Sequence, residues 1–149
     1  GEGYSTNIAV KVKDYGTFSE TFKVTVYANT TTIETKGISL ASGASATLAF
    51  TWYTSGFAKG NYTLWAYAWP VQGEADMSNN LMGKAITLTV PGDINGDGSV
   101  NLQDLVLLAN AYGSSMGTAK WNANADINGS LTVDLSDLVI LAKNYGRKI

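Results

Sequence analysis

The sequence predicts two domains, an antiparallel β-sandwich followed by a small helical module built from two loop–helix units. Three observations predict this fold class. Apolar residues alternate with polar residues up to about Val90, helical spacing replaces the alternation from Leu102, and a segment of the second half is repeated. The pattern changes at Pro91-Gly92, so we place the domain boundary there, with domains of residues 1–90 and 91–149.

Composition narrows the class of function. The chain has 149 residues, 45% of them hydrophobic and 15% charged, so it can bury a core. Its net charge of −2 and scattered basic residues give no electrostatic footprint for nucleic acid, and no apolar run is long enough to insert into a membrane. The first residues are neither a Met nor a signal peptide, so we expect a larger parent chain upstream of Gly1.

Catalytic residue types are scarce. Cys and His are absent, which removes the thiolate nucleophile, the zinc–thiolate site and the commonest general base. The acids outside the repeated segment all fall in predicted turns or at strand ends, without a second catalytic group nearby: Glu2, Asp14, Glu20, Glu34, Glu74 and Asp76. We therefore predict that the protein is not an enzyme.

The first domain shows a period of two, which is typical of half-buried strands. The apolar residues that would share the core face are Ile8, Val10, Val12, Phe22, Val24, Val26, Leu48, Phe50, Trp52, Tyr62, Leu64, Ala66, Ile86, Leu88 and Val90. Shorter runs around Ile33 and Ile38–Leu40 bring the expected number of strands to about seven.

One strand also carries an aromatic row on its other face. In YTLWAYAW, the residues Trp65, Tyr67 and Trp69 lie opposite the predicted core face. Such rows can stack on sugar rings, so these three residues are a candidate carbohydrate-binding site for a polysaccharide. The alternative is that protein covers them. An exposed row with a spacing of about 6–7 Å would favour the sugar.

The second domain contains an internal repeat. Residues 93–113 and 126–146 are identical at 13 of 21 positions, an offset of 33 residues, which indicates a duplication. In the first copy, oxygen-bearing residues recur at the spacing of a calcium loop, which offers roughly six to eight oxygen ligands. The predicted ligands are Asp93, Asn95, Asp97, the Ser99 carbonyl, Asn101 and Asp104. Gly98 provides the sharp turn, and Val100 is expected to point inward.

The second copy is an altered version of the same loop. Its predicted ligands are Asp126, Asn128, Ser130, the Thr132 carbonyl, Asp134 and Asp137. Each loop then presents three carboxylates, and the sequence predicts two calcium ions. Leu131 replaces the turn glycine, and a non-glycine residue in a left-handed conformation is strained by roughly 1–2 kcal/mol. We therefore expect the second site to be the weaker one.

These doubled loops end in Asp, and no helix precedes the first of them. In this respect residues 91–149 resemble a type I dockerin domain. The resemblance implies two loop–helix calcium units related by a pseudo-two-fold axis, with a connecting segment that includes Trp121. It also implies binding to a cohesin domain on a partner protein.

Each predicted helix has two apolar stripes, although a small helix needs only one for its own core. The stripes expected in the core contain Leu105, Leu108 and Tyr112, and Leu138, Leu141 and Tyr145. The other stripe is either buried against the β-domain or exposed as a partner surface. The dockerin resemblance implies the second alternative, with partner-binding residues Leu102, Gln103, Val106, Ala109, Asn110, Leu135, Ser136, Val139, Ala142 and Lys143. Because the copies match at most of these positions, docking in two orientations related by 180° is a hypothesis.

The first domain resembles a second family. Its LASGAS turn before AFTW, its GNYT strand and its E-x-D-x-S-N-N segment, residues 74–80, resemble a CARDB domain. That resemblance implies an immunoglobulin-like sandwich, an extracellular or cell-surface location and a spacing or adhesion role. The sequence therefore predicts a non-catalytic attachment module. The alternatives are a carbohydrate-binding or adhesion module using Trp65, Tyr67 and Trp69, and a dockerin that packs on its own β-domain without a separate partner.

Overall fold

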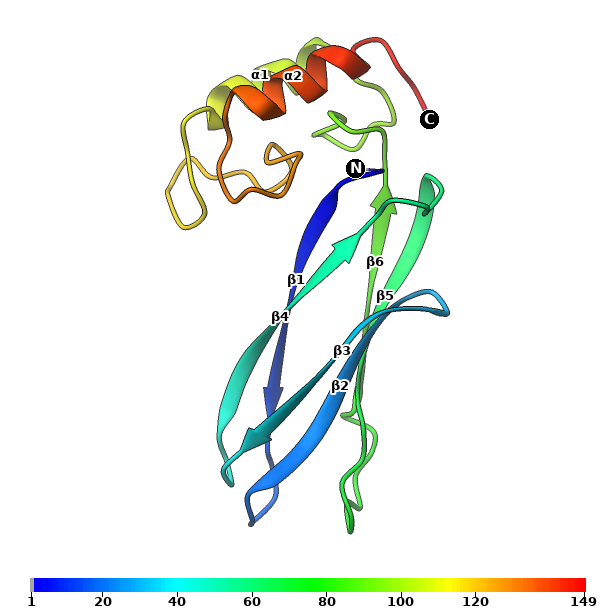
Figure 1. The fold of residues 1–149 in the computed structure, drawn as a ribbon, viewed down its shortest axis with the longest axis vertical. Coiled ribbons are helices and arrows are strands. Elements are labelled where there is room, and N and C mark those ends of the chain that lie inside the picture. The colour runs from blue at the N-terminus through cyan, green and yellow to red at the C-terminus, as the bar shows by residue number, and fades with distance from the viewer. Residues whose placement is uncertain (1) are drawn as a thin grey trace. The chain divides into compact units, whose positions relative to one another are not determined.

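The structure is a computed structural model that describes residues 2–149 (Figure 1). The chain forms two compact units. The sandwich unit contains Asn7–Trp52 and Tyr62–Ile86. The helical unit contains the residues up to Thr6, together with Tyr53–Asn61 and Thr87–Ile149.

Six strands make up the β-structure: β1 (Ser5–Lys13), β2 (Glu20–Ala28), β3 (Thr31–Leu40), β4 (Ser45–Tyr53), β5 (Gly60–Ala68) and β6 (Leu81–Leu88). They form a four-stranded sheet in the order β3-β2-β5-β6 and a two-stranded sheet of β1 and β4. β2 pairs antiparallel with both β3 and β5. The predicted antiparallel sandwich is confirmed.

The core of the sandwich is supplied by both sheets. Val24 and Val26 from β2 and Phe50 from β4 are buried, and partly buried side chains pack around them: Ile8, Val10, Val12, Phe22, Ile33, Leu48, Ala66 and Ala68. These residues alternate along their strands with side chains that face outward. The period of two therefore predicted the core face of β1, β2 and β4 correctly, whereas Val90, predicted for the same core, lies in the core of the helical unit.

The prediction of about seven strands is wrong by one, because β3 runs without a break through both Ile33 and Ile38. Two charged residues between these positions are only partly exposed. The Glu34 carboxylate accepts a hydrogen bond from Thr51 N at 3.2 Å. Lys36 Nζ donates to the Ala49 carbonyl and lies 3.3 Å from Glu34 Oε1. The pair thus satisfies backbone groups of β4 while β3 continues.

The helical unit contains α1 (Leu102–Ala111) and α2 (Leu135–Asn144). Each helix begins with a capping box, in which the N-cap residue and the acid three positions later exchange hydrogen bonds with each other's backbone. No helix of the described residues 2–149 is long and apolar enough to cross a membrane.

Both helices end one residue before their tyrosine. Tyr112 and Tyr145 are C-caps with ψ values of 135° and 131°, so the chain leaves the helix directly after them. They are 47% and 53% exposed, and the expectation that they complete the core stripes is wrong. Ala111 and Asn144, at the last helical positions, are buried instead.

The core of the helical unit extends beyond the repeat. Its buried members are Val90, Ile94, Val100, Leu108, Ala111, Ala125, Ile127, Val133 and Leu141. Val90 is only 1% exposed, and Tyr4 and Trp121 pack against the cluster. Glu2 N donates to the Thr89 carbonyl at 3.0 Å and holds the two segments together. Residues on the N-terminal side of the proposed boundary at 90/91 thus contribute to this core.

Candidate metal-binding loops and helix surface

The two repeated loops are closed by each other's helices. Val100 in the first loop is fully buried, donates to the Arg147 carbonyl at 2.9 Å and accepts from Gly146 N at 2.8 Å, directly after α2. Val133 in the second loop makes the matching bonds with Ser114 and Gly113 after α1, at 2.9 and 2.8 Å. This reciprocal pairing is the arrangement expected of two units related by a pseudo-two-fold axis. It also confirms that Val100 points inward.

Two buried acids tie the first loop together at its ends. The Asp93 carboxylate accepts hydrogen bonds from Gly96 N at 2.9 Å and Gly98 N at 3.0 Å. Asp104 is 0% exposed, and its Oδ1 accepts from Ile94 N at 2.7 Å while its Oδ2 accepts from Asn101 N at 2.9 Å. The loop therefore wraps around its first and last acids, as a cation-binding loop must.

In the middle of the first loop, side-chain oxygens accept hydrogen bonds from backbone N–H groups two residues further along the chain. Asn95 Oδ1 accepts from Asp97 N at 3.0 Å, and Asp97 Oδ1 accepts from Ser99 N at 2.9 Å. Asn101 is the N-cap of α1, and its Oδ1 accepts from Gln103 N at 2.7 Å. One residue thus serves both as a predicted metal ligand and as a helix cap.

The pKa values of two acids in the first loop are shifted in opposite directions. Burial raises the pKa of Asp93, and the negative charges of Asp104 and Asp97 raise it further, whereas hydrogen bonds from Gly98 and Gly96 lower it. The pKa of the exposed Asp97 is lowered, first by the hydrogen bond from the Asn95 side chain. Like charges that disfavour ionisation of Asp93 would favour a bound cation.

The second loop repeats the end contacts. Asp126 accepts from Ser130 N and Leu131 N, both at 2.9 Å, and Asp137 accepts from Ile127 N at 2.8 Å and Asp134 N at 2.9 Å. Burial raises the pKa of Asp126, with a further contribution from the charge of Asp137.

Two features distinguish the second loop from the first. Leu131 has a φ of 67°, whereas Gly98 at the matching position has a φ of 88°. The Ser130 hydroxyl donates to the Thr132 carbonyl at 3.1 Å, and this carbonyl is a predicted ligand. Both features favour the first loop as the better cation site.

The donor chemistry of the loops fits calcium, which takes carboxylate, amide and carbonyl oxygens. In residues 2–149 no three His, Cys, Asp or Glu side chains are grouped so that they alone could hold a metal ion. A bound ion would therefore depend on the amides of Asn95 and Asn128 and on backbone carbonyls as well as on acids. The twelve predicted ligands and the two ions remain predictions.

The second apolar stripe is exposed on both helices. Leu102 and Val106 are 62% and 51% exposed on α1, and Leu135 and Val139 are 60% and 42% exposed on α2. The other predicted partner residues are also exposed: Gln103, Ala109, Asn110, Ser136, Ala142 and Lys143. We call these residues together the helix surface. An exposed apolar patch of this kind is typical of an interaction site.

The aromatic row of β5 does not form a flat surface. Trp65 and Trp69 are 36% and 50% exposed, while Tyr67 is half-buried. The rings of Tyr67 and Trp69 meet edge to face at 66°, with centroids 5.6 Å apart. The Trp65 ring covers Gly83 of β6, where an added Cβ would lie 2.3 Å from Trp65 Cζ3. Sequence periodicity gave no signal for this contact, since a lone glycine in a strand has several explanations.

An immunoglobulin-like sandwich followed by two reciprocally paired loop–helix units defines a β-domain joined to a dockerin-like module. The CARDB family matches residues 2–81, and the dockerin type I domain family matches residues 91–145. The chain belongs to the CARDB family and carries a type I dockerin domain at its C-terminal end.

Solved structures are also similar to the chain. The CARDB domain of a Pyrococcus furiosus protein, in complex with di-metal ions, is 24% identical with a TM-score of 0.51, covering 58% of this chain and 79% of that chain. This likeness shows the fold alone. A mutant type II cohesin–X–dockerin complex from Acetivibrio cellulolyticus is 22% identical with a TM-score of 0.35, covering 85% of this chain and 83% of that chain. No curated protein matches the chain significantly.

Proposed function

We propose that the chain is a non-catalytic attachment module whose dockerin domain, residues 91–149, binds a cohesin domain on a partner protein. The observation that carries this proposal is the helix surface, where matching apolar residues are exposed on α1 and α2. A soluble domain seldom leaves two such stripes uncovered unless they bind a partner.

Calcium holds the helix surface in shape in this proposal. Each predicted site includes the N-cap of a helix, since Asn101 caps α1 and Asp134 caps α2, and its last ligand lies in the first turn of that helix. An ion bound in the loop therefore fixes the start of the helix that carries Leu102 or Leu135. Two matching surfaces also support docking in either of two orientations related by 180°.

The sandwich, residues 1–90, acts as a spacer that presents the dockerin, in an extracellular or cell-surface setting. Both matched families support this role, because CARDB domains are modular surface domains and weak calcium sites fill where the ion is plentiful. In that setting, the dockerin would attach a larger parent chain to the protein that carries the cohesin domain.

A calcium-dependent pull-down from the surface fraction of the source organism tests the proposal. We expect a cohesin-containing protein to bind in calcium and to be released by a chelator. Leu102→Asp and Leu135→Asp singly should each leave one orientation intact, and the double variant should abolish binding. Lys120→Asp, exposed outside the helix surface, is the matched control. The proposal would be contradicted if the partner protein is captured equally well with and without calcium, and equally well by the original chain and by the double variant.

A further inference from the structure

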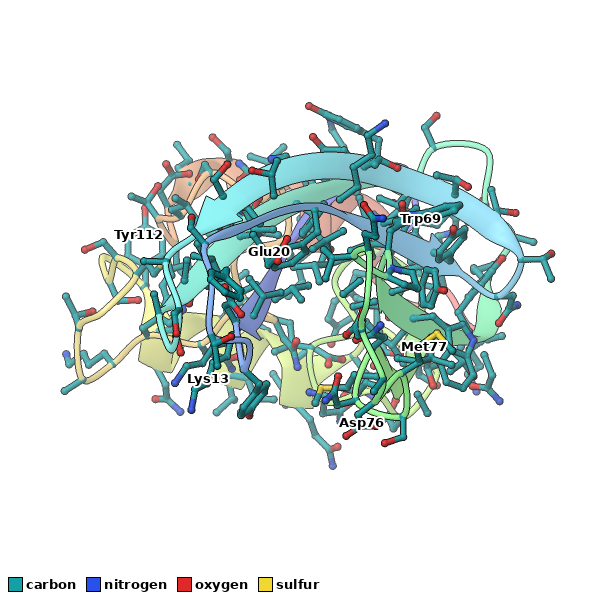
Figure 2. All side chains as sticks on the ribbon, turned by 90° about the horizontal axis from the view of Figure 1, so that it is seen from below. Lys13, Glu20, Trp69, Asp76, Met77 and Tyr112 are labelled. Carbon is teal, nitrogen blue, oxygen red and sulfur yellow. The ribbon has the colours of Figure 1, made fainter. Side chains whose placement is uncertain are left out.

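The sandwich unit contains a cavity that the proposed attachment function does not use. It has a volume of about 600 Å³ and is lined by the β1–β2 connection and the β5–β6 connection. Figure 2 shows Lys13 and Glu20 on one side of this end of the sandwich and Trp69 and Asp76 on the other. Cavities of roughly 300–1,000 Å³ are typical of small-ligand sites.

Two polar side chains that line this cavity each have one atom without a hydrogen-bond partner. Asp14 is 6% exposed, and its Oδ1 accepts from Gly16 N at 2.7 Å while its Oδ2 has no partner. Asn80 is 8% exposed, and its Nδ2 has no partner. Buried polar groups are nearly always paired, so one free acceptor from the β1–β2 connection and one free donor from the β5–β6 connection point to a missing partner.

A ligand with several hydroxyl groups can satisfy both atoms, because each hydroxyl donates one hydrogen bond and accepts others. A metal ion or an ammonium group can satisfy only the Asp14 oxygen and leaves the Asn80 N–H unpaired. Both free atoms are shielded from solvent, and the terminal torsions of Asp and Asn are broad enough to let them turn toward a ligand. The chemistry therefore favours a polyhydroxylated ligand over a cation.

Aromatic rings surround the same cavity. Tyr15, Phe18 and Trp69 line it and are 73%, 75% and 50% exposed. Trp69 is held in place, because its Nε1 donates to Thr25 Oγ1 at 2.9 Å and its backbone N donates to the Lys23 carbonyl at 2.8 Å. These bonds hold the Trp69 indole beside Thr25 and Tyr67 on the outer face of the sheet, so the exposed rings of Tyr15 and Phe18 are the ones that offer a flat apolar face to a sugar ring in the cavity.

The charge around the cavity selects against acidic ligands. Glu20, Glu74 and Asp76 line it in addition to Asp14, and Lys13 is its one cationic lining residue. Lys13 Nζ lies 4.5 Å from the centre of the Tyr15 ring and is already engaged there. We propose that this cavity binds a neutral saccharide. The proposal is independent of cohesin binding and places the sugar at the end of the sandwich, not along the β5 row.

The test is titration of the full chain, in calcium, with the neutral hexasaccharides of glucose, xylose and mannose, followed by calorimetry and amide NMR. We expect at least one to bind and to shift the amide signals of the β1–β2 and β5–β6 connections. Phe18→Ala should weaken binding about tenfold or more. Trp65→Ala removes an exposed aromatic outside the cavity and should leave affinity unchanged, and Tyr15→Ala provides a second, surface-exposed change at the cavity itself.

Asn80→Asp separates a sugar from a cation. Loss of the donor should reduce saccharide affinity, whereas binding of calcium or methylammonium at this site would become tighter in the same variant. The proposal is overturned if none of the three hexasaccharides binds at about 10 mM, a concentration that detects even millimolar affinity. It is also overturned if Trp65→Ala and Phe18→Ala weaken binding equally, or if only the cation probes bind.

Discussion

Replacement of Leu131 by Gly should stabilise the second calcium loop. Leu131 has a φ of 67°, in the left-handed region that costs an L-residue roughly 1–2 kcal/mol. Glycine removes this strain but gains about 0.4–1 kcal/mol of unfolded-state entropy that folding must overcome. The net gain in the free energy of unfolding should be about 0.5–1 kcal/mol.

The side chain itself must be separated from the backbone strain. Leu131 is 42% exposed, so truncation also removes some packing. Leu131→Ala is the matched control, because it loses the same packing but keeps a Cβ in the left-handed region. We expect the order of stability to be Gly above Ala by about 0.5–1 kcal/mol in urea unfolding without calcium.

The first loop offers the reverse experiment. Gly98 has a φ of 88°, and an added Cβ would meet the Ile149 side chain, with Cδ1 at 3.7 Å and Cγ1 at 3.8 Å, which are ordinary contacts. Gly98→Ala should therefore destabilise by about the amount that Leu131→Gly gains over Leu131→Ala. Calorimetry should show the second site strengthened by Leu131→Gly and the first weakened by Gly98→Ala. If Leu131→Ala is as stable as Leu131→Gly, backbone strain does not explain the difference between the loops.

Three further outcomes are expected. Gly83→Ala should lower the free energy of unfolding by about 1–3 kcal/mol and change the near-UV circular dichroism spectrum, because its Cβ displaces the Trp65 ring. Gly37→Ala, where the nearest neighbour of the added Cβ is 3.9 Å away, should be far less destabilising. Equal destabilisation by the two variants would contradict the contact between Trp65 and Gly83. Val90→Ala should lower the thermal midpoint of the helical unit through loss of a side chain that is 1% exposed, and an unchanged midpoint would place Val90 outside that core. Asp104→Asn should lower calcium affinity at the first loop and leave the second site titrating, as measured by calorimetry; retention of two unchanged sites would remove Asp104 from the ligand set.

Much of the fold follows from periodicity. The alternation in β1 and β4 identified the core face, because each of these strands is buried on one side only; in β2 the alternation also identified it, although Thr25 is buried on the opposite face. The same reasoning did not predict β3 as one continuous strand, since Glu34 and Lys36 lie partly buried between the sheets and use backbone groups of β4 as partners. Charged residues in sequence look like a break in a strand, and only the neighbouring strand reveals their role.

The conformation of the loops and the exposure of the helix surface were partly predictable from the sequence, whereas the predicted ligands and partner-binding residues remain predictions. The spacing of the loop oxygens, the inward valines and the exposed stripes are properties of short segments, so the repeat displayed them directly. The helix ends were not predictable in the same way, because Tyr112 and Tyr145 continue the helical period although the backbone has already left the helix. The cavity near Asp14 and Asn80 joins two connections far apart in the sequence, which no local pattern could bring together.

The bonds from Glu34 and Lys36 to β4 have a consequence for solubility. β4 belongs to a two-stranded sheet, so one of its edges has no neighbouring strand. An open edge of this kind is a template on which a strand of another molecule can add and start aggregation. Glu34 occupies the N–H of Thr51, and Lys36 occupies the carbonyl of Ala49, so that an incoming strand would have to displace an ion pair. A chain held at high local density beside its own copies would be kept apart by these two side chains.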